Sequence, residues 1–202
     1  MIEEKRALLV NITEYFMHKG FYKTTMDEVA AELKISKKTI YKYFPSKEYL
    51  LNLMFSGIAF TARNGIVKII NSDKSSVEKL AELINHICTL AARVNFDMLS
   101  DIKKLGPHFW NKIEKFRARQ IYANISKVII QGQEEGYIID VPKEIIVEML
   151  VASVQAIVTP EFVIKNSFSI TQAGQMTFTI FINGILTDEG KALYKKLKME
   201  SI

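Results

Sequence analysis

Cysteine, histidine and glycine-rich motifs are scarce in this chain of 202 residues, and each shortage excludes a class of protein. The single cysteine, Cys88, cannot form an internal disulfide framework, so we expect a reducing, cytoplasmic setting. The three histidines lie far apart, without the His-Glu-x-x-His or Cys-x-x-Cys spacing of a metal site. No glycine-rich phosphate loop follows a strand. We therefore expect no enzymatic activity, no metal and no cofactor.

Long hydrophobic runs are also missing. We find no uninterrupted stretch of about 18 apolar residues, which a membrane-spanning helix requires, and we expect no membrane partner. The first residues, Met-Ile-Glu-Glu, carry the wrong charge for a secretory signal. Because 49% of the residues are hydrophobic, the chain can still bury a sizeable core in one domain or two small ones.

Positive charge is concentrated in one short segment. The chain has 27 basic and 22 acidic residues, and five of the lysines lie between Leu33 and Lys47, where no acidic residue occurs. Outside this segment the charges of the chain cancel. A local surplus of this kind indicates an anionic partner more strongly than a high overall pI does.

Apolar residues recur at helical spacing along most of the chain. The first helices are expected at 3–19, from Thr25 (where "TMDE" forms a capping box with Glu28), at 36–44, and from Ser46 to about 71. Further helices are expected at 77–95, 97–105, 108–133, 143–164, 171–186 and from 188. The stretch 176–186 is rich in residues that also favour strands, but nothing nearby supplies partner strands. The expected fold is all-α, with about nine helices.

The first 44 residues have the pattern of a helix-turn-helix, because three short helices precede Pro45 and the last follows a turn of three to four residues. In this motif the last helix lies in the major groove of DNA. On a helical wheel, Ile40 and Phe44 point inward, whereas Lys38, Tyr41 and Lys42 project outward. An outward face of cations and hydroxyls suits phosphates and base edges. Lysines by themselves could simply form a solvated helix face. Here they coincide with exposed tyrosines, a capping box and a turn of the length that a helix-turn-helix has.

Helix starts near this face add further candidate contacts. Ser36 and Ser46 cap two helices whose free N–H groups can each hold a phosphate, and Thr24 and Thr25 offer the same at the helix before. Lys47 puts a cation in a first helical turn, where the helix dipole prefers an anion. A bound phosphate would account for it.

The stretch "GFYKTTMDEVAAELKISKKTIYKYFPSKEYL", residues 20–50, resembles the DNA-binding domain of the TetR family. It has the paired threonines, the pattern Ser-x-x-Thr-hydrophobic-Tyr-x-aromatic-Phe, and Ser-Lys-Glu-x-Leu. Lys34 and Lys38 depart from the pattern, because glycine is frequent at both positions. The resemblance implies a homodimeric regulator, usually a repressor that a small-molecule effector releases from double-stranded DNA with a palindromic operator. The residues and the resemblance together predict DNA contacts at Thr24, Thr25, Ser36, Lys37, Lys38, Thr39, Tyr41, Lys42, Tyr43 and Lys47.

The remaining residues are too many for DNA binding alone, so we divide the chain into a DNA-binding domain, 1–47, and a helical regulatory domain, 48–202. Two apolar helices in the second domain suit a four-helix dimer interface. The alternative is that both apolar stripes face their own core. The predicted interface residues are Ile146, Val147, Leu150, Val151, Val154, Ile157, Ile180, Phe181, Gly184 and Ile185.

A ligand pocket is expected where aromatic and methionine side chains gather around a Gly-Pro break, since such walls suit an apolar or cationic molecule. The same pattern also fits plain core. The candidates are Phe96, Met98, His108, Phe109, Trp110 and Phe116. Two other functions stay open: a DNA-binding protein of this fold without a ligand, and a helical small-molecule-binding protein or enzyme whose basic segment binds another anionic partner.

Overall fold

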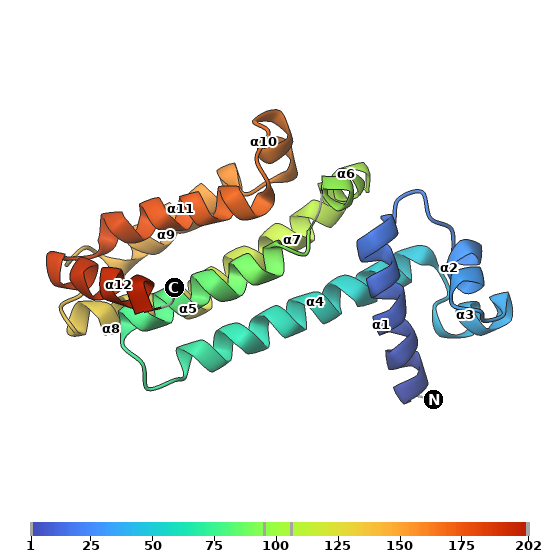
Figure 1. The fold of residues 1–202 in the computed structure, drawn as a ribbon, viewed down its shortest axis with the longest axis horizontal. Coiled ribbons are helices and arrows are strands. Elements are labelled where there is room, and N and C mark those ends of the chain that lie inside the picture. Colours follow the sequence, from blue (N-terminus) through green and yellow to red (C-terminus); the bar gives the residue numbers. More distant parts are fainter. Residues whose placement is uncertain (1, 95, 106, 201–202) are drawn as a thin grey trace.

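The chain folds into helices throughout the part that the computed structural model describes, residues 2–94, 96–105 and 107–200 (Figure 1). Helices α7, η1 and α8 form one continuous helix, so the described part contains eleven separate helices. The predicted all-α class is confirmed. The elements are α1 (Ile2–Lys19), α2 (Met26–Glu32), α3 (Lys37–Tyr43), α4 (Lys47–Ile70), α5 (Ser76–Ala91), α6 (Phe96–Lys104), α7 (Pro107–Gln120), the π-helical turn η1 (Ile121–Ile125), α8 (Ser126–Glu134), α9 (Lys143–Ile157), α10 (Pro160–Lys165), α11 (Ile170–Ile185) and α12 (Asp188–Glu200).

Helices α2, α3 and α4 each begin directly after a residue whose side chain caps the helix. The side chain of Thr25 accepts the N–H of Glu28, and the Glu28 carboxylate accepts the N–H of Thr25, which completes the predicted capping box. Ser36 and Ser46 cap α3 and α4, as predicted. The helix expected at 143–164 is instead two helices, α9 and α10. It restarts because Pro160 has no N–H to donate back to α9 and is favoured in the first turn of a new helix.

Helix α4 connects the two ends of the molecule (Figure 1). Its first turns bury Leu50, Leu51 and Met54 in a core with α1, α2 and α3, and its last turns bury Ile66 and Ile70 in a core with α5, α8, α9 and α11. Within the described residues, α4 is the one helix whose length and composition would suffice to cross a membrane. Core helices pass the same test, and both of its ends pack against protein.

The N-terminal core extends beyond residue 47. Met98 and Ile102 of α6 and Phe109 of α7 belong to the same hydrophobic cluster as the residues of α1, α2 and α3. A line of aromatic rings crosses this cluster, with Phe21 at 6.0 Å from Phe55 and Phe55 at 4.8 Å from Phe109, measured between ring centroids. The division at residue 47 stays a prediction, and packing crosses it.

The structure corrects the predicted dimer interface, because most of its residues lie in the core of their own chain. The residues in that core are Ile146, Val147, Leu150, Val151, Val154 and Ile185. Ile157 and Phe181 are half-buried, and only Ile180 and Gly184 are exposed. The strongest apolar stripe of an amphipathic helix packs against its nearest neighbours, and for α9 these are α8, η1 and α11.

Candidate nucleic-acid interface and regulatory pocket

Helix α3 turns a mixed basic and tyrosine surface outward. Ile40 is fully buried against α2, whereas Lys37, Lys38, Tyr41 and Lys42 are exposed. We call these four residues the α3 basic face. The predicted outward projection of Lys38, Tyr41 and Lys42 is confirmed.

The turn before α3 holds Lys34 in the left-handed region, with φ of 54°. The N–H of Lys34 donates to the carbonyl of Ala31 and the N–H of Ile35 to that of Ala30, which is the Schellman pattern of a helix end. Lysine at this position costs about 1 kcal/mol relative to glycine. The sharp turn that a helix-turn-helix needs is therefore kept, although glycine is absent.

The lysines of the α3 basic face differ in their partners. The ammonium of Lys37 contacts Asp27 of α2 at 2.5 Å, and this hydrogen bond raises the pKa of Lys37. Lys42 lies over the ring of Tyr43, 5.2 Å from its centroid. Among the described residues, neither Lys38 nor Lys42 forms an ion pair. These two cations are the ones most available to an anionic partner.

Two predicted DNA contacts lie elsewhere. Tyr43 is buried, and its hydroxyl donates to the carboxylate of Glu4 in α1, a bond that raises the pKa of Tyr43. The ammonium of Lys47 is half-buried and donates to the carbonyl of Tyr22 at 2.6 Å, and this burial lowers the pKa of Lys47. Both polar groups bond within the chain, to α1 and to the turn before α2, and the DNA contacts predicted for these two residues stay predictions.

Of the hydroxyl residues predicted to contact DNA near the starts of α2 and α3, Thr25 and Ser36 cap these helices. Thr25 and Ser36 are exposed, and the Ser36 hydroxyl lies 2.9 Å from that of Thr39. The N–H of Thr25 donates to Glu28 and lowers the pKa of that carboxyl. Thr24 is half-buried, and its hydroxyl donates to the Gly20 carbonyl. The starts of α2 and α3 thus lie at the surface beside the α3 basic face.

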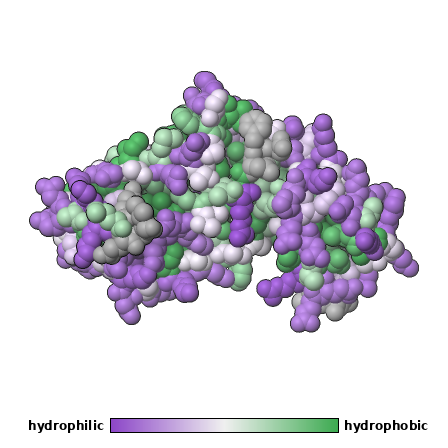
Figure 2. Space-filling view, viewed as in Figure 1, coloured by the Kyte–Doolittle hydropathy of each residue, from purple (hydrophilic) through white to green (hydrophobic). Residues whose placement is uncertain are grey.

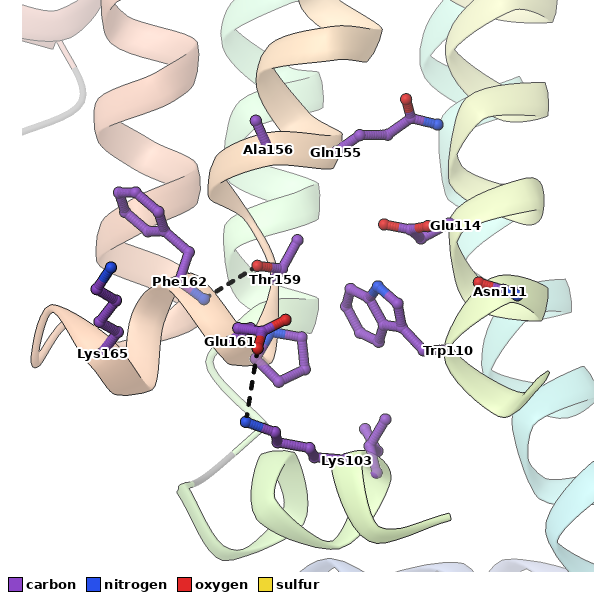
Figure 3. Close-up of a pocket in the computed structure, with 12 residues that line it drawn as sticks. Lys103, Trp110, Asn111, Glu114, Gln155, Ala156, Thr159, Glu161, Phe162 and Lys165 are labelled. Carbon is purple, nitrogen blue, oxygen red and sulfur yellow. Dashed lines mark hydrogen bonds and ion pairs between the residues drawn. The ribbon is translucent and has the colours of Figure 1, made fainter. Parts of the chain in front are cut away.

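A pocket of about 630 Å³ lies between α6, α7, α9 and α10 (Figure 3). Two carboxylates, Glu114 and Glu161, line it together with the cations Lys103 and Lys165. Its other lining residues are Ile102, Trp110, Asn111, Gln155, Ala156, Thr159, Pro160 and Phe162.

Of the predicted ligand residues whose side chains the structure describes, only Trp110 lines this pocket. Met98 and Phe109 are buried in the N-terminal core, His108 is exposed, and Phe116 is half-buried but outside the lining. The side chain of Phe96 lies outside the described residues. Local sequence could not reveal the other lining residues, because folding brings them together from four helices.

A half-buried arginine packs on the tryptophan that lines the pocket. The guanidinium of Arg117 lies 5.5 Å from the centroid of the Trp110 ring and donates to the carbonyls of Val158 and Val154 at the end of α9, at 2.9 and 3.1 Å. Burial lowers the pKa of Arg117 to about 10, against the opposing effect of Glu114. The pocket therefore offers a fixed aromatic wall with groups of both charges nearby, which suits a small molecule with an apolar body and a polar group.

Helix α3, which follows a tight turn and packs on α2, completes a helix-turn-helix, the motif that places its last helix in the major groove of DNA. Residues 8–54 match the family described as bacterial regulatory proteins, tetR family. The helix-turn-helix regulator YvaF of Bacillus subtilis (strain 168), whose role is uncharacterized, is 22% identical over 185 residues, 91% of this chain and 96% of that protein.

Solved structures share the fold. A transcriptional regulator from Cytophaga hutchinsonii ATCC 33406 has a TM-score of 0.73 at 20% identity, over 90% of this chain and 98% of its own. A putative transcriptional regulator from Saccharomonospora viridis, solved in complex with choline, has a TM-score of 0.70 at 18% identity, over 93% of this chain and 100% of its own. The chain thus resembles the tetR family in sequence over residues 8–54, and it shares the overall fold of these solved regulators.

Proposed function

We propose that the chain is a homodimeric repressor that binds a palindromic operator and leaves it when a small molecule occupies the pocket of Figure 3. The α3 basic face carries this proposal. Lys38 and Lys42 can neutralise phosphates, while Tyr41 is 45% exposed beside them and can reach base edges. Figure 2 shows hydrophilic side chains projecting around the end of the molecule that bears α2 and α3.

The proposed dimer uses the face of α9 and α11 that points away from the core. Ile145 and Met149 of α9 are 53% and 62% exposed, and Met176 and Ile180 of α11 are 45% and 74% exposed. The two helices pack against each other, and the space beside Gly184 is open. Exposed apolar residues on adjacent helices favour a self-complementary contact between two copies.

The proposed effector site is the pocket lined by Trp110. The related protein from Saccharomonospora viridis was solved with choline, which supports a small organic molecule as effector. Trp110 is the only tryptophan of the chain, so its fluorescence reports on this pocket directly.

A gel-shift assay with the DNA that flanks the chain's own gene tests the DNA-binding part. If each subunit neutralises about three phosphates, affinity falls roughly 10³-fold between 50 and 200 mM salt. A complex that is insensitive to salt would contradict a role for the lysines of α3.

Titration of the protein–DNA complex with candidate effectors tests the release, beginning with choline. An effector changes Trp110 emission saturably and frees the DNA over the same concentration range. A compound that frees the DNA without affecting Trp110 acts elsewhere and contradicts the assignment of the pocket.

A further inference from the structure

A buried carboxylate of α6 holds the backbone of the turn between α1 and α2. One oxygen of Asp101, Oδ2, accepts the N–H of Phe21 at 2.8 Å and the N–H of Tyr22 at 3.0 Å. The Asp101 side chain is only 12% exposed, and Lys104 lies 3.7 Å from its other oxygen. Eighty residues separate Asp101 from the turn in sequence, so this contact joins the regulatory part of the chain to the DNA-binding part.

The turn itself is shaped for this contact. Gly20 adopts φ of 77°, and a Cβ at this position would lie 2.7 Å from Asp101 Oδ2, so glycine allows the carboxylate to approach. The carbonyl of Tyr22 accepts the ammonium of Lys47 in α4. The Tyr22 residue is therefore held by α6 through its N–H and by α4 through its carbonyl. Helix α2 begins only three residues later, at its cap Thr25.

The same helix also lines the pocket. Ile102 and Lys103 of α6 are lining residues, and Lys103 forms a long ion pair of 3.9 Å with Glu161 of α10. Leu99 packs in a small cluster with Val163 of α10. Over nine residues, α6 thus contacts both the pocket wall and the turn that leads into α2.

We propose that Asp101 is a positioning residue for DNA binding, and that it transmits displacement of α6 at the pocket to the turn before α2. This inference rests on the proposed function. The carboxylate touches no DNA; it fixes where α2 begins, and α3 packs on α2. An effector that moves α6 loosens this hold, and the α3 basic face then loses its fixed orientation.

The first test compares DNA affinity among three variants. Asp101→Ala removes both acceptor contacts, Asp101→Asn keeps an acceptor oxygen, and Asp73→Asn removes the same charge at an exposed position beyond the end of α4. The probe is a duplex selected from a random-sequence pool by the wild-type protein. We expect a loss of about tenfold for Asp101→Ala, equivalent to about 1.4 kcal/mol. Asp101→Asn recovers most of this loss, and Asp73→Asn matches the wild type.

Two further readouts separate positioning from a plain loss of stability. Because Asp101 binds no phosphate, the salt dependence of binding keeps its slope in Asp101→Ala. Amide hydrogen exchange at Phe21 and Tyr22 speeds up in Asp101→Ala while the rest of the N-terminal core stays protected. Wild-type affinity in Asp101→Ala overturns the proposal, and so does a loss that follows only the unfolded fraction.

The link to the pocket can be tested without knowing the effector, because coupling between two sites is reciprocal. Saturation with the selected duplex changes Trp110 emission in the wild type and leaves it unchanged in Asp101→Ala. An equal change in both proteins overturns the role of Asp101 in coupling. If the wild-type protein selects no duplex from the pool, that result contradicts the proposed function. Amide exchange at Phe21 and Tyr22 then tests independently whether Asp101 holds the turn.

Discussion

Helices α3 and α9 present the same sequence pattern and use it in different ways. Each has an apolar stripe at helical spacing, and in each the stripe packs inside its own chain: Ile40 in α3, and Leu150 with its neighbours in α9. The opposite faces differ. That of α3 carries lysines and tyrosine, whereas that of α9 carries Ile145 and Met149. The apolar stripe thus locates the core of this protein, and the opposite face indicates the partner.

The largest expected effect comes from removing the chemistry of the α3 basic face. The double variant Tyr41→Ala/Lys42→Ala removes a proposed base-reading group and a proposed phosphate contact from both subunits of the proposed dimer, so DNA affinity should fall roughly 10³-fold or more. Gel shifts at several salt concentrations measure this loss and a smaller salt slope. Lys68→Ala, which removes an exposed lysine near the far end of α4, serves as control.

The same double variant distinguishes the proposed regulator from a small-molecule-binding protein without DNA. Binding at Trp110 should persist, because the pocket lies in other helices. Loss of DNA and ligand binding together indicates a folding defect. If the double variant binds DNA as tightly as the wild type, α3 does not form the DNA interface.

Substitutions in the buried apolar stripe of α9 should lower the stability of the folded chain rather than weaken the proposed dimer. Leu150 is fully buried, and Leu150→Ala leaves a cavity that costs about 2–5 kcal/mol of unfolding free energy. Urea unfolding measures this cost. If Leu150→Ala instead dissociates into folded monomers of unchanged stability, the stripe forms the dimer contact after all.

The outer face of α9 and α11 should affect assembly. Ile180→Asp places a charge at the proposed contact in both subunits, and we expect the dimer dissociation constant to rise at least about 30-fold, equivalent to roughly 2 kcal/mol. Sedimentation equilibrium measures this constant. Phe60→Asp makes the same kind of change at an exposed position of α4 and should leave the dimer intact. Equal effects of the two variants would contradict the proposed face.

The smallest expected effect concerns two capping boxes, one at the start of α2 and one at the start of α5. The pKa values of Glu28 and Glu78 are both lowered in the fold, by the hydrogen bonds of Thr25 and Ser75. Since each folded pKa lies below the ordinary value of 4.5, the ionised caps stabilise the protein above that value. This stability disappears as the pH falls through the folded pKa.

The matched variants are Glu28→Gln and Glu78→Gln. Thermal unfolding should show each variant less stable than the wild type at neutral pH, with the difference disappearing on acidification. Only Glu28→Gln should also weaken DNA binding, because Thr25 begins α2 beside α3. A difference from the wild type that grows as the pH falls contradicts the assigned direction of the pKa shift.

Local chemistry made the helix boundaries predictable. Thr25, Ser36 and Ser46 cap their helices through bonds within four residues, so sequence spacing was sufficient. The break before Pro160 was missed, although proline in the first turn of a new helix is a local signal for it. The bond of Tyr43 to Glu4 was not predictable, because Glu4 lies 39 residues away in α1 and local spacing does not show which helices meet.

The all-helical class and the outward basic face of α3 followed from the order of residues alone, since capping and amphipathic spacing act within one or two helical turns. The burial of the α9 stripe, the lining of the pocket and the contact of Asp101 with the turn at Phe21 were decided only by the tertiary structure. Each depends on which distant helices meet, and the free energy of such packing is shared among segments that no local pattern connects.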